Sequence, residues 1–223
     1  MTRNRYKIFE TDYPYLVTCT IVEWLDLLKP EIVKQIIIES LRYLKIESAI
    51  KLFAYVIMHN HIHLIISSDN IVKNMCRFKS FTARQIIDYY KGEINIYKNE
   101  HYRGEPVNEE NDRSRAEPRN NYHLNPSKCD TGNLRTRLCP AVDGLEIIKI
   151  LHNINPEYHI SSEHQFWQEG YCPKQIMNFG IFQQKINYIH LNPIRKGYVD
   201  SPEEWKWSSA NPNGLIEIDP VWD

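Results

Sequence analysis

Three histidines occupy alternate positions in the stretch HNHIHLII, at His59, His61 and His63. Successive side chains of a β-strand point to opposite faces of its sheet, so a strand here would place these imidazoles on one face. The apolar residues that alternate with them would share the other face, which suits a hydrophobic core. Imidazoles at i and i+2 on a strand point the same way and can chelate one metal ion. A surface strand with chance histidines would have the same pattern, so both interpretations stay open at this point.

A tyrosine and an asparagine lie four residues apart in NYIHLNP, at Tyr188 and Asn192. This spacing puts both side chains on one face of a helix. The apolar stripe of that helix would be formed by Phe182, Ile186 and Ile189. A tyrosine on the polar face, one turn from an amide, can act as a nucleophile beside a ligand. Taken alone, these residues favour a simpler interpretation, a half-buried tyrosine whose hydroxyl finds a hydrogen bond.

The elements that must position these residues follow from hydrophobic periodicity and from helix start and stop signals. We expect strands over Tyr15–Leu25, Ile50–Met58, His61–Ser67 and Ser162–Cys172, with a turn around His59–Asn60. We expect helices over Pro30–Glu47, Ile71–Gly92, Gly144–Ile154 and Pro173–Pro193. This order predicts an α+β fold, a ferredoxin-like sandwich with a central antiparallel sheet that carries the His-x-His strand and with helices packed on one face.

The organisation of the chain is that of a single domain over residues 1–223 with one insertion. Apolar residues thin out over residues 93–143, where Asn, Glu, Arg and Pro dominate. Such a composition predicts a polar insertion that buries little apolar surface. The tail from about residue 211 is expected to be irregular.

Composition limits the possible functions. The chain has a formal net charge of −1 at pH 7, so any nucleic-acid affinity must come from local basic patches. Its five cysteines fit no C-x-x-C pattern, and we expect reduced thiols in a cytoplasm. No apolar run approaches the roughly 18 residues of a membrane span, and MTRNRYKIFE lacks the apolar core of a secretory signal. We therefore expect a soluble cytoplasmic protein with no membrane partner.

Four stretches follow one another along the chain: AYVIMHNHIHLII, FKSFTARQI, FWQEGY and QQKINYIHLNPIRKGYV. In this order they resemble the REP-associated tyrosine transposases, which are single-tyrosine HUH nucleases of the IS200-like type. The resemblance covers Tyr15 to about Ala210 apart from the insertion, which is long for the family. The His-x-His element alone is a weak signal, and its combination with YIHLNP is specific.

The resemblance implies a role for each of four residues. It implies that His61 and His63 are metal ligands, that Asn192 is the third ligand and that Tyr188 is the nucleophile. Many members of the family carry proline where this chain has His59, which leaves open whether His59 is an extra ligand or a turn residue. The implied partner is single-stranded or hairpin DNA, bound by a monomer or a homodimer, in the cytoplasm and on the nucleoid when DNA is bound.

The chemistry of the residues agrees with these roles. A phosphodiester repels nucleophiles, and a divalent ion on a non-bridging oxygen neutralises that charge. A phenol with a pKa near 10 is a weak nucleophile at pH 7 and needs such help. The product would be a 5′-phosphotyrosine and a free 3′-OH. Two imidazoles and an amide oxygen suit Mg²⁺ or Mn²⁺, and the ligand types are also compatible with Zn²⁺.

Basic and aromatic residues are the candidates for DNA contact. The predicted phosphate contacts are Arg3, Arg5, Lys73, Arg77, Arg84, Lys185, Arg195 and Lys196. Trp167, Trp205 and Trp207 can stack unpaired bases, although core packing is the more usual role of such tryptophans.

Two other functions fit the same residues. One is a catalytically silent DNA-binding regulator derived from a transposase. The other is a metal hydrolase in which Tyr188 only positions a water molecule. A covalent adduct between protein and DNA would distinguish the proposed transposase from both.

Overall fold

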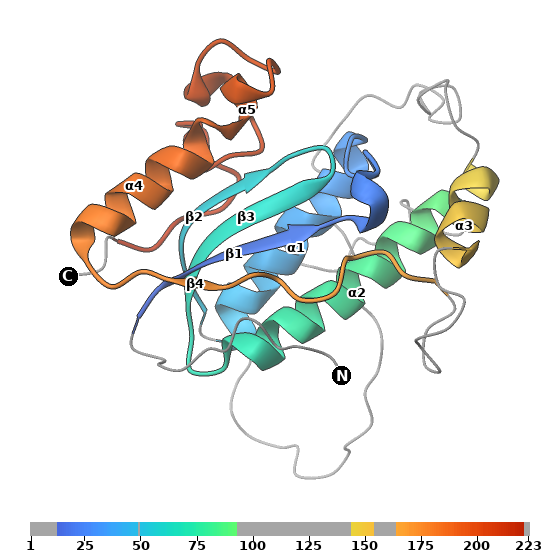
Figure 1. Ribbon diagram of the computed structural model, residues 1–223, viewed down its shortest axis with the longest axis horizontal. Helices are drawn as coiled ribbons and strands as arrows, with labels where there is room; N and C mark the ends of the chain where they lie inside the picture. Colours follow the sequence, from blue (N-terminus) through green and yellow to red (C-terminus); the bar gives the residue numbers. More distant parts are fainter. Residues whose placement is uncertain (1–12, 49, 93–143, 154–163, 221–223) are drawn as a thin grey trace, which may run out of the picture.

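The computed structural model describes residues 13–48, 50–92, 144–153 and 164–220 (Figure 1). Its strands are β1 (Tyr15–Thr20), β2 (Lys51–Ile57), β3 (His61–Ser67) and β4 (Lys174–Gln175). Its helices are α1 (Glu31–Ser48), α2 (Ile71–Lys91), α3 (Gly144–Asn153), α4 (Phe179–His190) and α5 (Asn192–Arg195). Over these residues no helix is both long enough and apolar enough to cross a membrane.

The four strands form one antiparallel sheet in the order β2-β3-β1-β4. β3 is an inner strand, and its register with β1 places Thr18 opposite His63 and Thr20 opposite His61. The predicted α+β class, the antiparallel sheet and the position of the histidines on a strand are confirmed.

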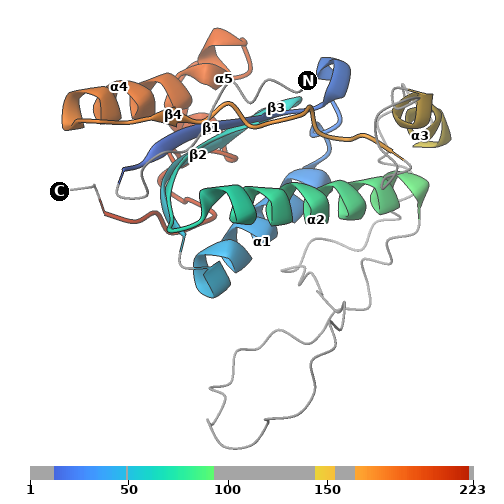
Figure 2. The same cartoon turned by 60° about the horizontal axis from the view of Figure 1, so that its bottom comes forward.

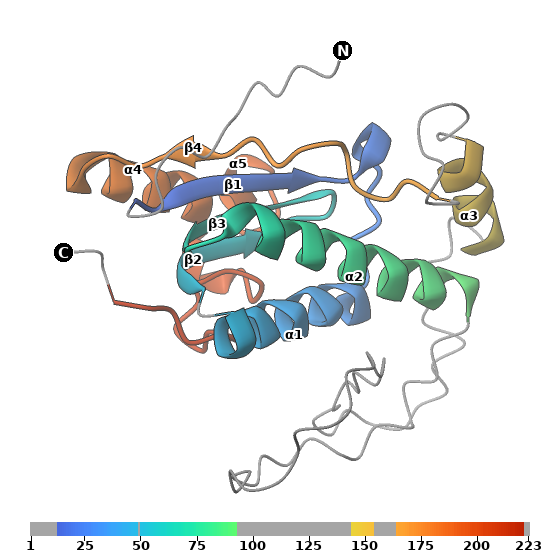
Figure 3. The same ribbon diagram turned by 90° about the horizontal axis from the view of Figure 1, so that it is seen from below.

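Helices cover both faces of the sheet, whereas the sequence predicted them on one face. Figure 2 and Figure 3 show α1 and α2 on one side of the sheet and α4 on the other. The reason is that β3 is apolar on both faces: Leu64 belongs to the core under α1 and α2, and Ile65 belongs to a second core with Phe182 and Ile189 of α4. A strand buried on both faces lies inside a three-layer sandwich.

Several predicted boundaries shift. β1 ends at Thr20, and a 3₁₀ turn over Val22–Trp24 follows it. The segment after His164 runs beside β1 through single hydrogen bonds, such as Thr18 N–H to the carbonyl of Tyr171, and does not form the regular strand predicted over Ser162–Cys172. Positive φ angles at Gly170 and Cys172 break its extended course.

The last predicted helix begins later than expected. Residues 174–175 pair with β1 as β4, and Asn178 then caps α4 by accepting a hydrogen bond from the Ile181 N–H. Residues 211–220 contain no helix or strand, as predicted for the tail, although Ile216 packs into the core. The insertion 93–143 lies outside the described residues.

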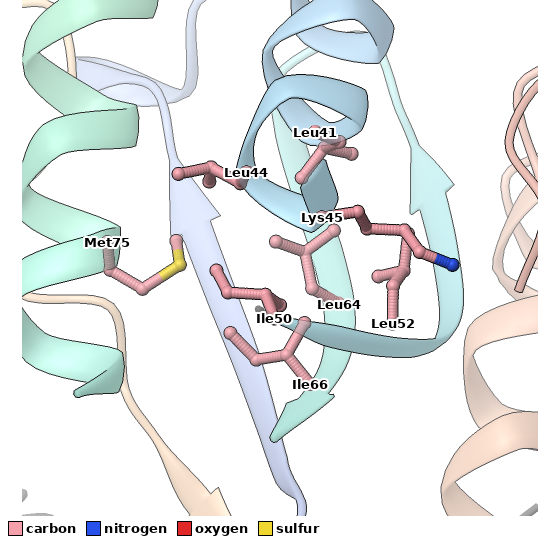
Figure 4. Close-up of a pocket in the computed structure, with 8 residues that line it drawn as sticks. All are labelled: Leu41, Leu44, Lys45, Ile50, Leu52, Leu64, Ile66 and Met75. Atoms are coloured by element: carbon pink, nitrogen blue, oxygen red, sulfur yellow. The ribbon is translucent and has the colours of Figure 1, made fainter. Parts of the chain in front are cut away.

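The core under α1 and α2 is closely packed. A cavity of about 10 Å³ lies between these helices and the sheet, and Figure 4 shows the side chains that line it. Apart from Lys45 its lining is apolar: Leu41, Leu44, Ile50, Leu52, Leu64, Ile66 and Met75. A void of this size holds one water molecule at most, so this cavity is not a binding site for a substrate.

Candidate active site

His61 and His63 lie side by side on the face of β3 that α4 covers. Their rings are 4.8 Å apart between centroids, and the two residues are 6% and 5% exposed. They share this face because they are two residues apart on a strand. Burial next to the α4 core, rather than exposure to solvent, distinguishes them from chance histidines on a surface strand.

One nitrogen of each imidazole is already engaged. His63 Nδ1 lies 2.8 Å from the hydroxyl of Thr18, its partner on β1. His61 Nδ1 lies 2.7 Å from the amide oxygen of Asn60. That oxygen can only accept, so Nδ1 of His61 carries the proton and Nε2 carries the lone pair. Hydrogen bonds of this kind fix the tautomer and orientation of metal-binding histidines.

Both imidazoles are held in the neutral form that metal binding requires. Burial, with a smaller effect from Lys196, lowers the pKa of His61 to about 4. Burial lowers the pKa of His63 to about 3, with smaller effects from His61 and Lys174. Desolvation disfavours the charged form, and nearby cations add to the effect.

Tyr188 reaches the histidines from α4, the helix that packs on their face of the sheet. It lies on α4, is 37% exposed, and its ring centroid is 5.4 Å from that of His63. The guanidinium carbon of Arg195, on α5, lies 5.4 Å from the centroid of the Tyr188 ring. The tyrosine therefore has a histidine on one side and a cation nearby, with its side chain partly open to solvent.

Asn192 is joined to this group through the backbone of Tyr188. It is 8% exposed at the start of α5, and its amide nitrogen donates a 2.8 Å hydrogen bond to the Tyr188 carbonyl. Within the part of the chain that the structure describes, its Oδ1 makes no hydrogen bond. The oxygen that a metal would need is therefore not used elsewhere.

The donor set fits a divalent ion of mixed N and O preference. The candidates are Nε2 of His61, Nε2 of His63 and the amide oxygen of Asn192. Among the described residues no group of three His, Cys, Asp or Glu side chains can hold a metal. Two imidazoles with an amide, completed by water or phosphate, are thus the donors that this site offers.

His59 belongs to a different group. It lies in the β2–β3 turn, before strand alternation begins, and its ring stacks on Tyr198 at 4.2 Å with 24° between the planes. The ring of Trp205 is 5.8 Å away. These contacts make His59 part of an aromatic cluster at the turn.

The predicted basic residues separate into two sets. Arg195 contacts Tyr188, Lys196 lowers the pKa of His61, and Lys185 lies one turn before Tyr188 on α4. Lys174, which the sequence did not single out, lowers the pKa of His63. In the described ranges, Lys174, Arg195 and Lys196 form no ion pairs, so their charges remain for a bound anion.

The second set lies away from the histidines. Lys73, Arg77 and Arg84 are exposed on α2, which packs on the opposite face of the sheet. The structure therefore does not bring them to the candidate site. Arg3 and Arg5 lie outside the described residues.

Besides Lys174, sequence reasoning missed three side chains close to the histidines: Thr18, Asn60 and Trp24. The first two hold the histidines by hydrogen bonds, and the Trp24 ring lies 6.0 Å from that of His61. The first could be recognised only from the strand register, and the other two only from the turns. The predicted stacking residues Trp167 and Trp207 are each 5% exposed and pack in the core.

Comparison with known proteins agrees with the motifs and the fold. The family described as "Transposase IS200 like" matches residues 4–104, which include the histidine strand. No curated protein sequence matches the chain. A solved structure described as "Structure of the REP associates tyrosine transposase bound to a REP hairpin" is similar, with a TM-score of 0.54 and 14% identity over 100% of this chain and 93% of that one. Residues 4–104 are thus similar to the IS200-like transposase family, and the overall fold is similar to that of a REP-associated tyrosine transposase.

Proposed function

We propose that this protein is a transposase, a metal-dependent endonuclease and strand transferase that acts on single-stranded DNA beside a hairpin, with Tyr188 as its nucleophile. The observation that carries the proposal is the approach of Tyr188, on α4, to His63, on β3, at 5.4 Å between ring centroids. A phosphate bound at the imidazoles, beside this contact, would lie next to the tyrosine side chain. In-line attack needs the tyrosine oxygen to lie opposite the leaving 3′ oxygen, while the ion acts on a non-bridging oxygen.

The reaction forms one bond and breaks one. The oxygen of Tyr188 attacks the phosphorus, and the bond from phosphorus to the 3′ oxygen breaks. The phenolic proton is balanced by the proton of the released 3′-OH, and the part of the strand downstream of the cut stays on the protein through its 5′ phosphate, as a 5′-phosphotyrosine. Attack by another 3′-OH on the phosphotyrosine reverses the step and joins strands without an external energy source.

The side chains of the site support this step in separate ways. His61, His63 and Asn192 would hold a divalent ion, which when bound supplies charge neutralisation at a non-bridging phosphate oxygen. Thr18 and Asn60 orient the imidazoles. The cations Lys174, Arg195 and Lys196 favour an anionic ligand at this face of the sheet.

The preference for a single-stranded substrate is supported by the closeness of Tyr188 on α4 to the histidines on β3. Tyr188 is only partly exposed and its ring lies against the histidine strand. A duplex is stiff, and its second strand would obstruct the approach of a phosphate to Tyr188 and to the histidines. A single strand can bend to reach both. The neighbouring solved structure is bound to a REP hairpin, which supports a hairpin beside the cleaved strand.

The test uses labelled hairpin DNA with a single-stranded flank, incubated with the protein and Mn²⁺ and resolved on a denaturing protein gel. We expect a covalent adduct that is lost on chelation of the metal. The same sequence as a full duplex, at the same salt concentration, should give little adduct. Binding without adduct or cleavage would indicate a silent regulator, and cleavage without adduct would indicate a hydrolase; either result would reject the tyrosine mechanism.

A further inference from the structure

An exposed tryptophan stands at the edge of the candidate site. Trp24 is 59% exposed, yet its ring lies 6.0 Å from that of His61 at 71° between the planes. We propose that Trp24 is a stacking platform for an unpaired nucleobase adjacent to the phosphate bound at this site. This inference rests on the proposed function, because it assigns a base-binding residue to the same single-stranded substrate.

Trp24 differs from the other tryptophans that the structure describes. Trp167 and Trp207 are each 5% exposed, and the ring of Trp205 packs on Tyr198 at 5.3 Å. Tryptophan is usually buried over most of its surface, since its ring carries a large apolar area. A tryptophan left open beside two buried histidines is therefore available for a planar ligand.

The backbone holds Trp24 in this exposed position against its own preference. Glu23 and Trp24 have φ angles of 50° and 55°, a left-handed region that is unfavourable for residues with a Cβ. Such conformations persist only where the surroundings impose them, and they gather at functional sites. Here the buried residues Val22 and Leu27 anchor the chain on both sides of the turn.

Hydrogen bonds fix the same turn to the histidine strand. The amide nitrogen of Asn60 donates to the Trp24 carbonyl at 3.2 Å, while its amide oxygen accepts from Nδ1 of His61. The Ile21 N–H donates to the Asn60 carbonyl, and the Leu28 N–H donates to the His59 carbonyl. The side chain of Asn60 thus positions both the backbone of Trp24 and the ring of His61. The turn that carries the Trp24 ring is therefore preorganised beside the site.

The charges around the ring favour a base over a phosphate. Glu23 and Asp26 are exposed on the same turn and would repel phosphate oxygens. The cation that lowers the pKa of His61 is Lys196, which follows α5 and not this turn. A strand whose phosphate binds at the histidines would therefore meet this turn with a base, and stacking on an aromatic ring accepts any base.

The test measures binding of two 12-mers to the full chain in EDTA at one salt concentration. One is oligo(dT), and the other is the abasic equivalent, which has the same phosphates and no bases. The variants are Trp24→Ala, the conservative Trp24→Phe and the control Phe179→Ala. Phe179 is also an exposed aromatic residue, at 53%, but it lies at the opposite end of α4 from Tyr188.

We expect Trp24→Ala to bind oligo(dT) about tenfold more weakly, the effect of losing one stacked base. The abasic 12-mer should bind Trp24→Ala and wild type equally, Trp24→Phe should recover most of the oligo(dT) affinity, and Phe179→Ala should resemble wild type. Equal losses on both 12-mers would mean that Trp24 only supports the fold, and no loss on either would mean that it does not contact DNA; both results would overturn the proposal.

A second measurement locates the base. The length of the DNA in the covalent adduct gives the cleavage position, and each flanking nucleotide of the hairpin substrate is then replaced by an abasic one. One replacement should weaken wild type about tenfold and leave Trp24→Ala unchanged. If wild type forms the adduct while neither replacement distinguishes the two proteins, Trp24 has no stacking role at the site although the proposed function stands. If no adduct forms on any hairpin, the proposed function is rejected, and the stacking proposal at this site is rejected with it.

Discussion

The ring of Tyr188 meets the ring of His63 at 65° between the planes, across the boundary between α4 and β3. His63 is in turn fixed by Thr18 on the neighbouring strand. The tyrosine is attached to a helix whose apolar side, with Phe182 and Ile189, is buried on the sheet. The separation of nucleophile and imidazole is therefore set by the packing of a core, and changes in either side chain can be made without removing that core.

The first prediction concerns the hydroxyl of Tyr188. Tyr188→Phe keeps the ring against His63 and should keep the melting temperature and the affinity for hairpin DNA within experimental error. It should form no adduct, because the attacking oxygen is gone. Cleavage by this variant at the wild-type rate, measured on a denaturing gel, would show that another group attacks the phosphate.

The second prediction separates the histidines. His61→Ala and His63→Ala should each lose metal-dependent cleavage on the order of 100-fold or more, because a bound ion contributes several kcal/mol to the transition state. His59→Ala should retain most of the cleavage rate. It removes the stacking on Tyr198, so unfolding in urea should show a loss of about 0.5–1.5 kcal/mol. If His59→Ala were as inactive as His61→Ala, the turn histidine would belong to the site.

The sequence pattern was sufficient to predict the strand and the face that His61 and His63 share. Period-two alternation from His61 to Ile66 predicts which side chains share a face, and the buried pair on β3 confirms it. The same alternation would put His59 on that face, but the chain turns before β3 and the ring stacks elsewhere. Alternation identifies faces only while the strand lasts.

The rest of the site depends on contacts between distant segments. Thr18 meets His63 because β1 pairs with β3 in one register, and nothing in the local sequence of either strand indicates that pairing. Trp24 lies in a turn in which two non-glycine residues, Glu23 and Trp24 itself, adopt positive φ angles. Such a turn has no reliable sequence signature. The packing of α4 on this face of the sheet depends on Ile65 of β3 as well as on the apolar residues of α4.

The third prediction tests the support of His63. Thr18→Val is nearly isosteric and removes the oxygen that lies 2.8 Å from His63 Nδ1. Loss of such a supporting hydrogen bond typically lowers metal affinity or activity about 10–100-fold. Thr18→Ser keeps the hydroxyl and should recover most of the activity, measured as the rate of adduct formation at several Mn²⁺ concentrations. A Thr18→Val variant with wild-type activity would mean that His63 is oriented by packing alone.

The fourth prediction concerns the insertion 93–143. The described segments on either side of it lie close together: α2 is capped by Gly92, and a Cβ on Gly144 would collide with the carbonyl oxygen of Tyr90. Deletion of about residues 108–138 should therefore leave a connection of feasible length, with little change in closure entropy. We expect the adduct and the melting temperature to be largely retained. A drop of many degrees would show that the deleted segment packs on the domain, and the deletion should keep Gly144 in every variant.

The fifth prediction is a dependence of stability on pH. The folded-state pKa values of His61 and His63, about 4 and about 3, lie below the ordinary value of 6.5. Between pH 6.5 and these values the unfolded chain binds more protons than the folded one, so stability falls as pH falls through this window. Each imidazole should remove about 2 kcal/mol between pH 7 and pH 5 in the absence of metal.

The measurement is urea unfolding in EDTA at both pH values. A variant with His61→Asn and His63→Asn lacks both titrating groups, and its loss of stability between pH 7 and pH 5 should be smaller than that of wild type by about 4 kcal/mol. His59 and His190, whose pKa values are also lowered by burial, remain in both proteins and cancel in the comparison. Equal losses in wild type and variant would show that the two imidazoles are hydrated in the folded protein, and the site would then not be the dry, neutral pair on which metal binding depends.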